Sequence, residues 1–148
     1  MAKQIELKIV KGPVSLKLLE NIISASGDSS SIGAQSIFIG RVRADKISGR
    51  TVKKIHYEHY RLMTEKVLYE IGESALQKYP IESLCIVHSE NDVPVGGISL
   101  FVLVSAKHRS ASINACNFVV EEIKIKAPIW GKEIFEDETY TWKENTKA

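Results

Sequence analysis

The segment Gly40-Arg41-Val42-Arg43 places two arginines directly after the apolar run Ile37-Phe38-Ile39. Arginine recognises phosphate or carboxylate through paired hydrogen bonds, and in extended backbone Arg41 and Arg43 point to the same side. The segment therefore predicts an anion-binding pair at the end of a strand. Two solvated charges that merely flank a strand would give the same pattern.

A second basic segment, Ser105-Ala106-Lys107-His108-Arg109-Ser110, precedes an expected helix. The free amides and the dipole at a helix N-terminus favour anions, so His108 and Arg109 are candidates for binding phosphate there. Histidine changes charge near neutral pH, which would also let His108 donate a proton. The alternative is a histidine that only caps the helix or packs against a loop.

The third segment, Lys124-Ile125-Lys126-Ala127-Pro128-Ile129-Trp130-Gly131-Lys132-Glu133, spans the expected end of a helix and the turn that follows it. Cations are common at helix C-termini for electrostatic reasons alone. A partly desolvated lysine, however, can have a lowered pKa and take part in acid, base or covalent chemistry. A lysine of this segment is therefore a candidate for acid, base or covalent chemistry.

Neither cysteine has the surroundings of a reactive or metal-bound thiol. Cys85 and Cys116 lie in apolar stretches without ligand spacing, so we expect no zinc site and no disulfide. Mid-helix cysteines usually act as small apolar residues. The other histidines, His56, His59 and His88, lack a comparable setting and are interpreted as structural.

Hydrophobic periodicity predicts the elements that must position these segments. Alternation over Ile5, Leu7 and Ile9 indicates a strand, and a short amphipathic helix should follow from Leu16 to Ile23. The further elements expected are strands at 34–43, 52–60, 84–89 and 98–105, helices at 61–79 and 111–126, and a terminal hairpin at 129–142.

Two helices should each present one apolar stripe to a sheet. The stripe predicted for helix 61–79 includes Leu62 and Leu68, and that for helix 111–126 includes Val119 and Ile125. Strand pairs that alternate with single helices favour an α+β fold with a largely antiparallel sheet. We expect one domain over residues 1–148.

Composition excludes several classes of protein. The 148 residues are 44% hydrophobic and 26% charged, as in an ordinary globular domain. Twenty basic residues against 18 acidic ones give a net charge of +2, too small to predict a nucleic-acid-binding face. The apolar run Ile98–Ala106 is far shorter than the roughly 20 residues of a membrane span, and the alternating N-terminus is unlike a signal peptide. We expect a cytoplasmic protein without a membrane segment.

Together, these segments resemble the molybdopterin synthase large (catalytic) subunit along nearly the whole chain. The motifs that carry the resemblance are Phe38-Ile39-Gly40-Arg41-Val42-Arg43, Tyr57-Glu58-His59-Tyr60 followed by Met63-Thr64-Glu65-Lys66, the segment Ser105–Ser110, and Lys124–Glu133 with its Ala-Pro-Ile-Trp centre. The resemblance implies an α/β hammerhead fold with a small additional β subdomain. It also implies a homodimer with one ubiquitin-like small subunit at each end, a heterotetramer.

The resemblance further implies a sulfurtransferase of molybdenum cofactor biosynthesis. In that family the small subunit ends in Gly-Gly bearing a thiocarboxylate, and two sulfur transfers to cyclic pyranopterin monophosphate build the dithiolene of molybdopterin. Family pockets borrow residues across the dimer. No metal or other cofactor is implied for the subunit itself.

The family roles are transferred to matching positions of this chain. The implied catalytic residues are Lys124 and Lys132, and the implied substrate-binding residues are Arg41, Val42, Arg43, His108, Arg109, Lys124, Gly131, Lys132 and Glu133. One position departs from the pattern, because the family usually has lysine directly after the tryptophan and this chain has Gly131. A shift of one residue in a strand turns a side chain to the other face, so Lys132 need not replace the missing lysine.

A different class of function stays open on these residues alone. The chain would then be a non-enzymatic module that binds a phosphorylated ligand through Arg43, His108 and Arg109 and regulates a partner. Such a module needs no lysine chemistry. A neighbouring gene or copurifying small protein that ends in Gly-Gly would favour the enzyme.

Overall fold

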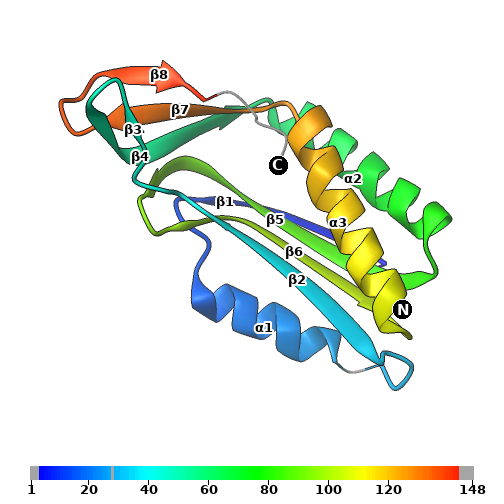
Figure 1. Ribbon diagram of the computed structural model, residues 1–148. Coiled ribbons are helices and arrows are strands. Elements are labelled where there is room, and N and C mark those ends of the chain that lie inside the picture. The colour runs from blue at the N-terminus through cyan, green and yellow to red at the C-terminus, as the bar shows by residue number, and fades with distance from the viewer. Residues whose placement is uncertain (1–3, 28, 144–148) are drawn as a thin grey trace.

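The computed structural model describes residues 4–27 and 29–143, and within them the chain forms three helices and eight strands (Figure 1). In chain order they are β1 (Ile5–Lys11), α1 (Leu16–Ser26), β2 (Ala34–Arg41), β3 (Lys46–Ile47), β4 (Arg50–His59), α2 (Arg61–Lys78), β5 (Ile81–Pro94), β6 (Ile98–Ala106), α3 (Arg109–Lys126), β7 (Ile129–Phe135) and β8 (Tyr140–Trp142).

Strand β5 is 14 residues long and belongs to two groups of strands. Its first part pairs with β1 in parallel and with β6 in antiparallel orientation, and β2 lies on the far side of β6. Its last residues, Asn91–Pro94, pair with β4, which continues through β7 to β8. The predicted α+β class with a largely antiparallel sheet is confirmed, and β3, β4, β7 and β8 form the additional small β unit.

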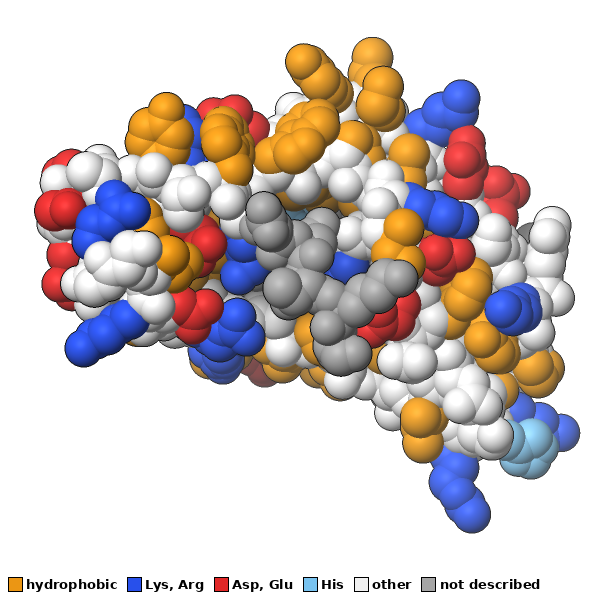
Figure 2. Space-filling model, turned by 45° about the horizontal axis from the view of Figure 1, so that its top comes forward, with side chains coloured by type: hydrophobic (Ala, Val, Ile, Leu, Met, Phe, Trp, Pro, Cys, Tyr) orange, Lys and Arg blue, Asp and Glu red, His pale blue; other side chains and the backbone are white. Residues whose placement is uncertain are grey.

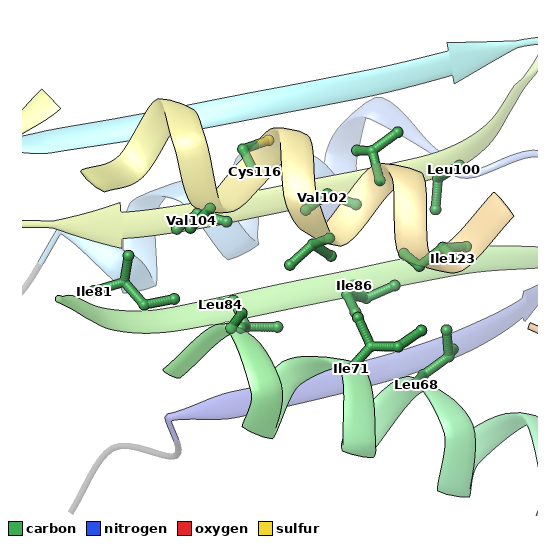
Figure 3. Close-up of a cluster of buried hydrophobic side chains, with 14 of the residues drawn as sticks. Leu68, Ile71, Ile81, Leu84, Ile86, Leu100, Val102, Val104, Cys116 and Ile123 are labelled. Carbon is green, nitrogen blue, oxygen red and sulfur yellow. The ribbon is translucent and has the colours of Figure 1, made fainter. Parts of the chain in front are cut away.

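The helices cover both faces of the sheet that β2, β6, β5 and β1 form. Helices α2 and α3 lie on one face and α1 on the other (Figure 1). Figure 3 shows the larger core, in which Leu68 of α2 and Ile123 of α3 meet Ile86 and Val102 of the sheet. Because strand side chains alternate between faces, neighbouring positions of β5 and β6 supply the second core beneath α1.

Several element boundaries differ from those predicted. Strand β2 ends at Arg41, where a register shift between Gly40 and Arg41 interrupts pairing with β6. Strand β5 extends well beyond the predicted 84–89 because its end pairs with the second sheet. The β3–β4 hairpin was not predicted, and its two-residue turn, Ser48-Gly49, has positive φ at both positions.

The predicted apolar stripes were correct in the middle of each helix and wrong at the ends. Leu68 and Val119 are fully buried, whereas Leu62 is 85% exposed and Ile125 is 65% exposed. Leu62 lies in the first turn of α2 and Ile125 in the last turn of α3. Helical periodicity gives the direction of a side chain, but not the point at which the sheet beneath the helix ends.

Leucines on the same helix give a stability test of this packing. We expect Leu68→Ala to lower the free energy of unfolding by about 2 to 5 kcal/mol, because truncation leaves a cavity in the core. Leu62→Ala should change it by no more than about 0.5 kcal/mol, because that side chain is exposed. Urea unfolding of both variants measures this, and equal effects would contradict the packing.

Candidate active site

The two groups of strands meet at a small cavity beside the end of α3. Ala127 and Pro128 connect α3 to β7, and β7 then pairs with β4 so that Gly131 lies opposite Tyr57. On β5, His88 is the last residue that pairs with β6 before the strand continues toward the second sheet. The cavity has a volume of about 90 Å³ and is lined by Tyr57, His88, Ile123, Lys124, Ala127, Ile129, Trp130, Gly131 and Lys143.

Lys124 lies in the last turn of α3 and keeps contact with solvent. The pKa of its amine is lowered, first by desolvation at the cavity and then by the positive charges of Lys143 and Arg43. The carboxylate of Glu121 acts in the opposite direction. An accessible lysine with a lowered pKa can exchange a proton with a bound reactant, or stabilise negative charge while it is protonated.

His88 is a buried neutral imidazole at the wall of the cavity. Its Nδ1–H donates to the carbonyl of Ser89 at 2.8 Å, which leaves Nε2 as a hydrogen-bond acceptor. Burial is the main reason that the pKa of His88 is lowered to about 4, and the nearby charge of Lys124 contributes in the same direction. The ring of Tyr57 contacts the imidazole edge to face, with 5.2 Å between centroids.

Tyr57 also lines the cavity. Burial raises the pKa of this phenol, a hydrogen bond with Ser99 partly offsets the effect, and the charge of Glu133 raises it further. The hydroxyl is therefore protonated at neutral pH. Two uncharged side chains, Tyr57 and His88, thus line the cavity beside Lys124.

A buried histidine next to the cavity connects β4, β5 and α2 through hydrogen bonds. His59, at the end of β4, contacts Glu90 of β5 through Nε2 and Thr64 of α2 through Nδ1, each at 3.0 Å. The side chain of His59 is 5% exposed and Thr64 is fully buried. This network fixes the start of α2 against the strand that carries His88.

The structure separates the residues predicted to bind an anion near β2. Arg41 donates to the carbonyl of Gly96 at 2.7 Å, and Arg43 forms an ion pair with Asp45 at 3.1 Å. Val42, between them, is buried in a small cluster with core residues of β4 and β5. Of the two arginines, Arg43 is the one whose charge reaches Lys124.

His108 and Arg109 lie at the opposite end of α3 from Lys124. His108 is the residue before the helix, Arg109 is its first residue, and both are exposed. Lys124 follows Arg109 by fifteen positions of α helix, which is about 22 Å along the axis at 1.5 Å per residue. A single copy of the chain therefore does not bring these residues to the cavity.

Lys132 lies on the other face of β7 from the cavity. Its amine lies 4.5 Å from the ring centroid of Tyr140 and 5.1 Å from that of Trp142. Gly131 lines the cavity, and Glu133, two residues further along β7, is buried. The amine of Lys132 therefore does not take the place of a lysine at position 131.

Sequence reasoning missed His88 and Lys143 as cavity residues. His88 stands alone in an apolar strand, and its position becomes special only because β5 passes from one sheet to the other at that point. Lys143 directly follows β8, far in sequence from Lys124. No local motif marks either residue.

The two cysteines are buried, as their sequence context predicted. Burial raises the pKa of Cys85 to about 12 and that of Cys116 to about 11, so both thiols are protonated at neutral pH.

Within residues 4–27 and 29–143, no three His, Cys, Asp or Glu side chains are grouped to bind a metal ion. Among those same residues, no helix is both long and apolar enough to cross a membrane. The cytoplasmic location stays a prediction.

A larger open groove, of about 1040 Å³, lies between β1 and α2. Its cations Lys8 and Arg61 are already paired with Glu6 and Glu65. Much of its lining is aliphatic, including Leu7 and Leu76. This groove has no grouping of a lysine, a histidine and a tyrosine. The smaller cavity at Lys124 is therefore the better candidate for chemistry.

Comparison with known proteins gives the family. Residues 9–126 match the family described as "MoaE protein", and the chain belongs to this family. A relative from Pyrococcus abyssi, named molybdopterin synthase catalytic subunit, is 37% identical over 96% of this chain and 93% of its own length. A rat relative of the same name is also 37% identical, over 78% of this chain, which spans 58% of that longer protein.

Solved structures agree with this assignment. A molybdopterin synthase structure from Staphylococcus aureus superposes with a TM-score of 0.81 and 31% identity, covering 97% of this chain and 99% of the other. The fold also matches a chain in a complex of subunits 1 and 2 of molybdopterin-converting factor from Helicobacter pylori, with a TM-score of 0.78 and 21% identity over 93% and 90% of the two chains. The expected hammerhead architecture is thus confirmed.

The buried His88 predicts a pH dependence of stability. Its pKa is about 4 in the folded chain, compared with the ordinary value of 6.5 that applies to the unfolded chain. Below pH 6.5 the unfolded chain therefore binds a proton at this residue that the folded chain does not bind. Stability should therefore fall as the pH drops from 6.5 toward 4, by roughly 3 kcal/mol from this group. Urea unfolding across this range should show that the free energy of unfolding changes less with pH in His88→Gln than in wild type.

The matched control for this measurement is His108→Gln, because His108 is exposed at the start of α3. That variant should keep the wild-type dependence on pH. If the free energy of unfolding of His88→Gln depended on pH as strongly as that of wild type, burial would not be holding the imidazole of His88 neutral.

Proposed function

We propose that this chain is the catalytic subunit of molybdopterin synthase, and that the cavity at Lys124 is where sulfur is transferred. The donor is the C-terminal thiocarboxylate of a small ubiquitin-like carrier, and the acceptor is cyclic pyranopterin monophosphate. The observation that carries the proposal is the accessible Lys124, whose pKa is lowered, in a cavity that neutral His88 and Tyr57 also line. Membership of the MoaE family supports the same reaction.

The proposed chemistry requires a proton-transfer group and positive charge at one point. In the transfer that opens the cyclic phosphate, the thiocarboxylate sulfur forms a carbon–sulfur bond while the carbon–oxygen bond to the phosphate breaks, which leaves additional negative charge on the phosphate. In the other transfer, sulfur replaces an oxygen of the precursor that leaves as water. After each transfer, water cleaves the acyl–sulfur bond and releases the carrier as a carboxylate. Lys124 can exchange a proton at the attacked carbon, and its cationic form stabilises the charge that develops in the transition state.

The sulfur must be brought by the carrier, because the chain offers no suitable thiol. Cys85 and Cys116 are buried and their pKa values are raised to about 12 and 11, so neither supplies a thiolate nucleophile at neutral pH. The carrier's extended tail would need to reach only the narrow cavity. A cavity of about 90 Å³ suits the end of a peptide tail better than a whole pterin.

We infer that the complete anion site is built from two copies of the chain. Arg43 acts near Lys124 within one copy, whereas His108 and Arg109 lie about 22 Å away along α3. In a homodimer, those two residues of a second copy can approach the cavity of the first. This arrangement keeps the substrate-binding roles implied by the family resemblance and explains why the single chain does not assemble them.

The body of the carrier would dock on the apolar surface beside the cavity. The start of α2 and the end of α3 both adjoin the His59–Ile129 end of the β4–β7 pair. Figure 2 shows exposed hydrophobic side chains gathered along this edge of the molecule. Those that flank the cavity are Tyr60, Leu62, Ile125 and Trp130, and the rings of Tyr60 and Trp130 pack edge to face at 5.7 Å. With one carrier on each copy, the assembly is a heterotetramer.

The proposed role of Lys124 is tested by comparing it with Lys132. Lys124→Ala should lower product formation by a factor of about 100 to 10,000, the usual effect of losing a positioned acid or base. Lys132→Ala should lose much less, because Lys132 lies over Tyr140 and Trp142 on the other face of β7. Single-turnover assays with carrier and precursor, with thermal melting to check folding, measure both. A Lys124→Ala variant at the wild-type rate would refute the proposal.

The shared site predicts complementation between inactive variants. Lys124→Ala and Arg109→Ala chains should each be impaired alone, yet a mixed dimer contains one site with neither substitution. Unfolding and refolding the two variants together should therefore recover a fraction of wild-type activity, up to about one quarter of the sites after random pairing. Activity that stays at the level of the separate variants would place both residues in the site of one copy.

A further inference from the structure

We propose that Lys143 is a substrate-binding lysine of this cavity, and that it supplies the second positive charge beside Lys124 for an anionic group of the reactants. The inference rests on the proposed function, because it names a further residue of the same site. The anionic group is either the phosphate of the precursor or the carboxylate-type group at the end of the carrier tail.

The backbone places Lys143 next to Gly131. The Lys143 N–H donates to the carbonyl of Gly131 at 2.8 Å, just beyond the paired residues of β7 and β8. A Cβ atom on Gly131 would lie 3.8 Å from the Cβ of Lys143 and 3.1 Å from Cγ2 of Ile55. The glycine therefore leaves room at this wall that a side chain of its own would fill, and Lys143 lines the cavity there.

Gly131 has no side chain, so it brings no positive charge to this wall of the cavity. Lys132, the next residue, brings none either, because its amine lies over the rings of Tyr140 and Trp142 outside the cavity. Lys143 approaches the same wall from the neighbouring strand. Lys143 thus brings its positive charge to this wall from the end of β8.

The electrostatics of the cavity agree with this role. Lys143 and Arg43 both disfavour the protonated form of Lys124, and Glu121 favours it. The buried imidazole of His88 is neutral, so it adds no further positive charge to the cavity at neutral pH. Like charges held close together repel until an anion binds between them, and binding then relieves the repulsion.

The test compares Lys143→Ala with Lys143→Arg in single-turnover assays. We expect the alanine variant to lose a factor of about 100 in rate, as when one charge-stabilising donor is removed, and the arginine variant to keep most of the activity. Lys126→Ala is the matched control, because Lys126 is an exposed lysine at the end of α3 that pairs with Glu122. Wild-type activity in Lys143→Ala, or equal losses in the alanine and arginine variants, would overturn the inference.

A change in pH dependence separates a charge effect from a purely structural one. Without the positive charge of Lys143, the pKa of Lys124 should rise, and the limb of the pH–rate profile that belongs to Lys124 should move to higher pH. A slower variant with an unmoved profile would overturn the inference. Titrations of each variant with precursor and with carrier show which reactant brings the anion, since the affinity for that reactant should weaken.

Binding of inorganic phosphate tests Lys143 separately from the reaction. Isothermal titration of the intact chain should show weaker phosphate binding by Lys143→Ala than by wild type and Lys126→Ala. If wild type forms no product but this difference is found, the proposed function fails while Lys143 remains an anion-binding residue. Equal phosphate affinities in all three proteins would overturn the inference whatever the assay of product shows.

Discussion

The continuity of β5 is the constraint on which the site depends. One strand pairs with β1 and β6 along its first part and with β4 at its end, so the two groups of strands are held at a fixed junction. His88 lies at that junction, where β6 pairing ends. The end of α3 and the start of β7 adjoin the same point because Ala127-Pro128 connects them directly. The cavity is a consequence of this topology.

Burial and charge act against each other at this junction. The apolar core keeps His88 neutral and raises the pKa of Tyr57, while Lys124 remains in contact with solvent. Lys124 and Lys143 bring positive charges into a partly desolvated space, and the exposed Arg43 adds its charge from nearby. Desolvation and these charges make the protonated form of Lys124 less favourable than in water. A protein gains no stability from such repulsion. The arrangement is useful when anionic reactants occupy the space and compensate the charges.

Local patterns predicted most elements, because hydrophobic alternation and helical periodicity depend on neighbouring residues. They failed where a contact between distant segments decides the outcome. The length of β5 depends on β4, and Leu62 and Ile125 are exposed because their helices continue beyond the packed core. The motifs identified the family and drew attention to Lys124. They could not show that Lys132 faces away from the cavity or that His88 lines it, since both facts follow from strand register and pairing.

The separation of His108 and Arg109 from Lys124 likewise follows from the length of α3, which the sequence did predict closely. The central claim is that this cavity converts the precursor rather than merely binding it. Mixing the chain with thiocarboxylated carrier and cyclic pyranopterin monophosphate, and analysing the pterin by mass spectrometry, tests that claim directly. The account predicts a product that has gained two sulfur atoms as a dithiolene. Precursor that binds but is recovered unchanged in the presence of competent carrier would contradict it.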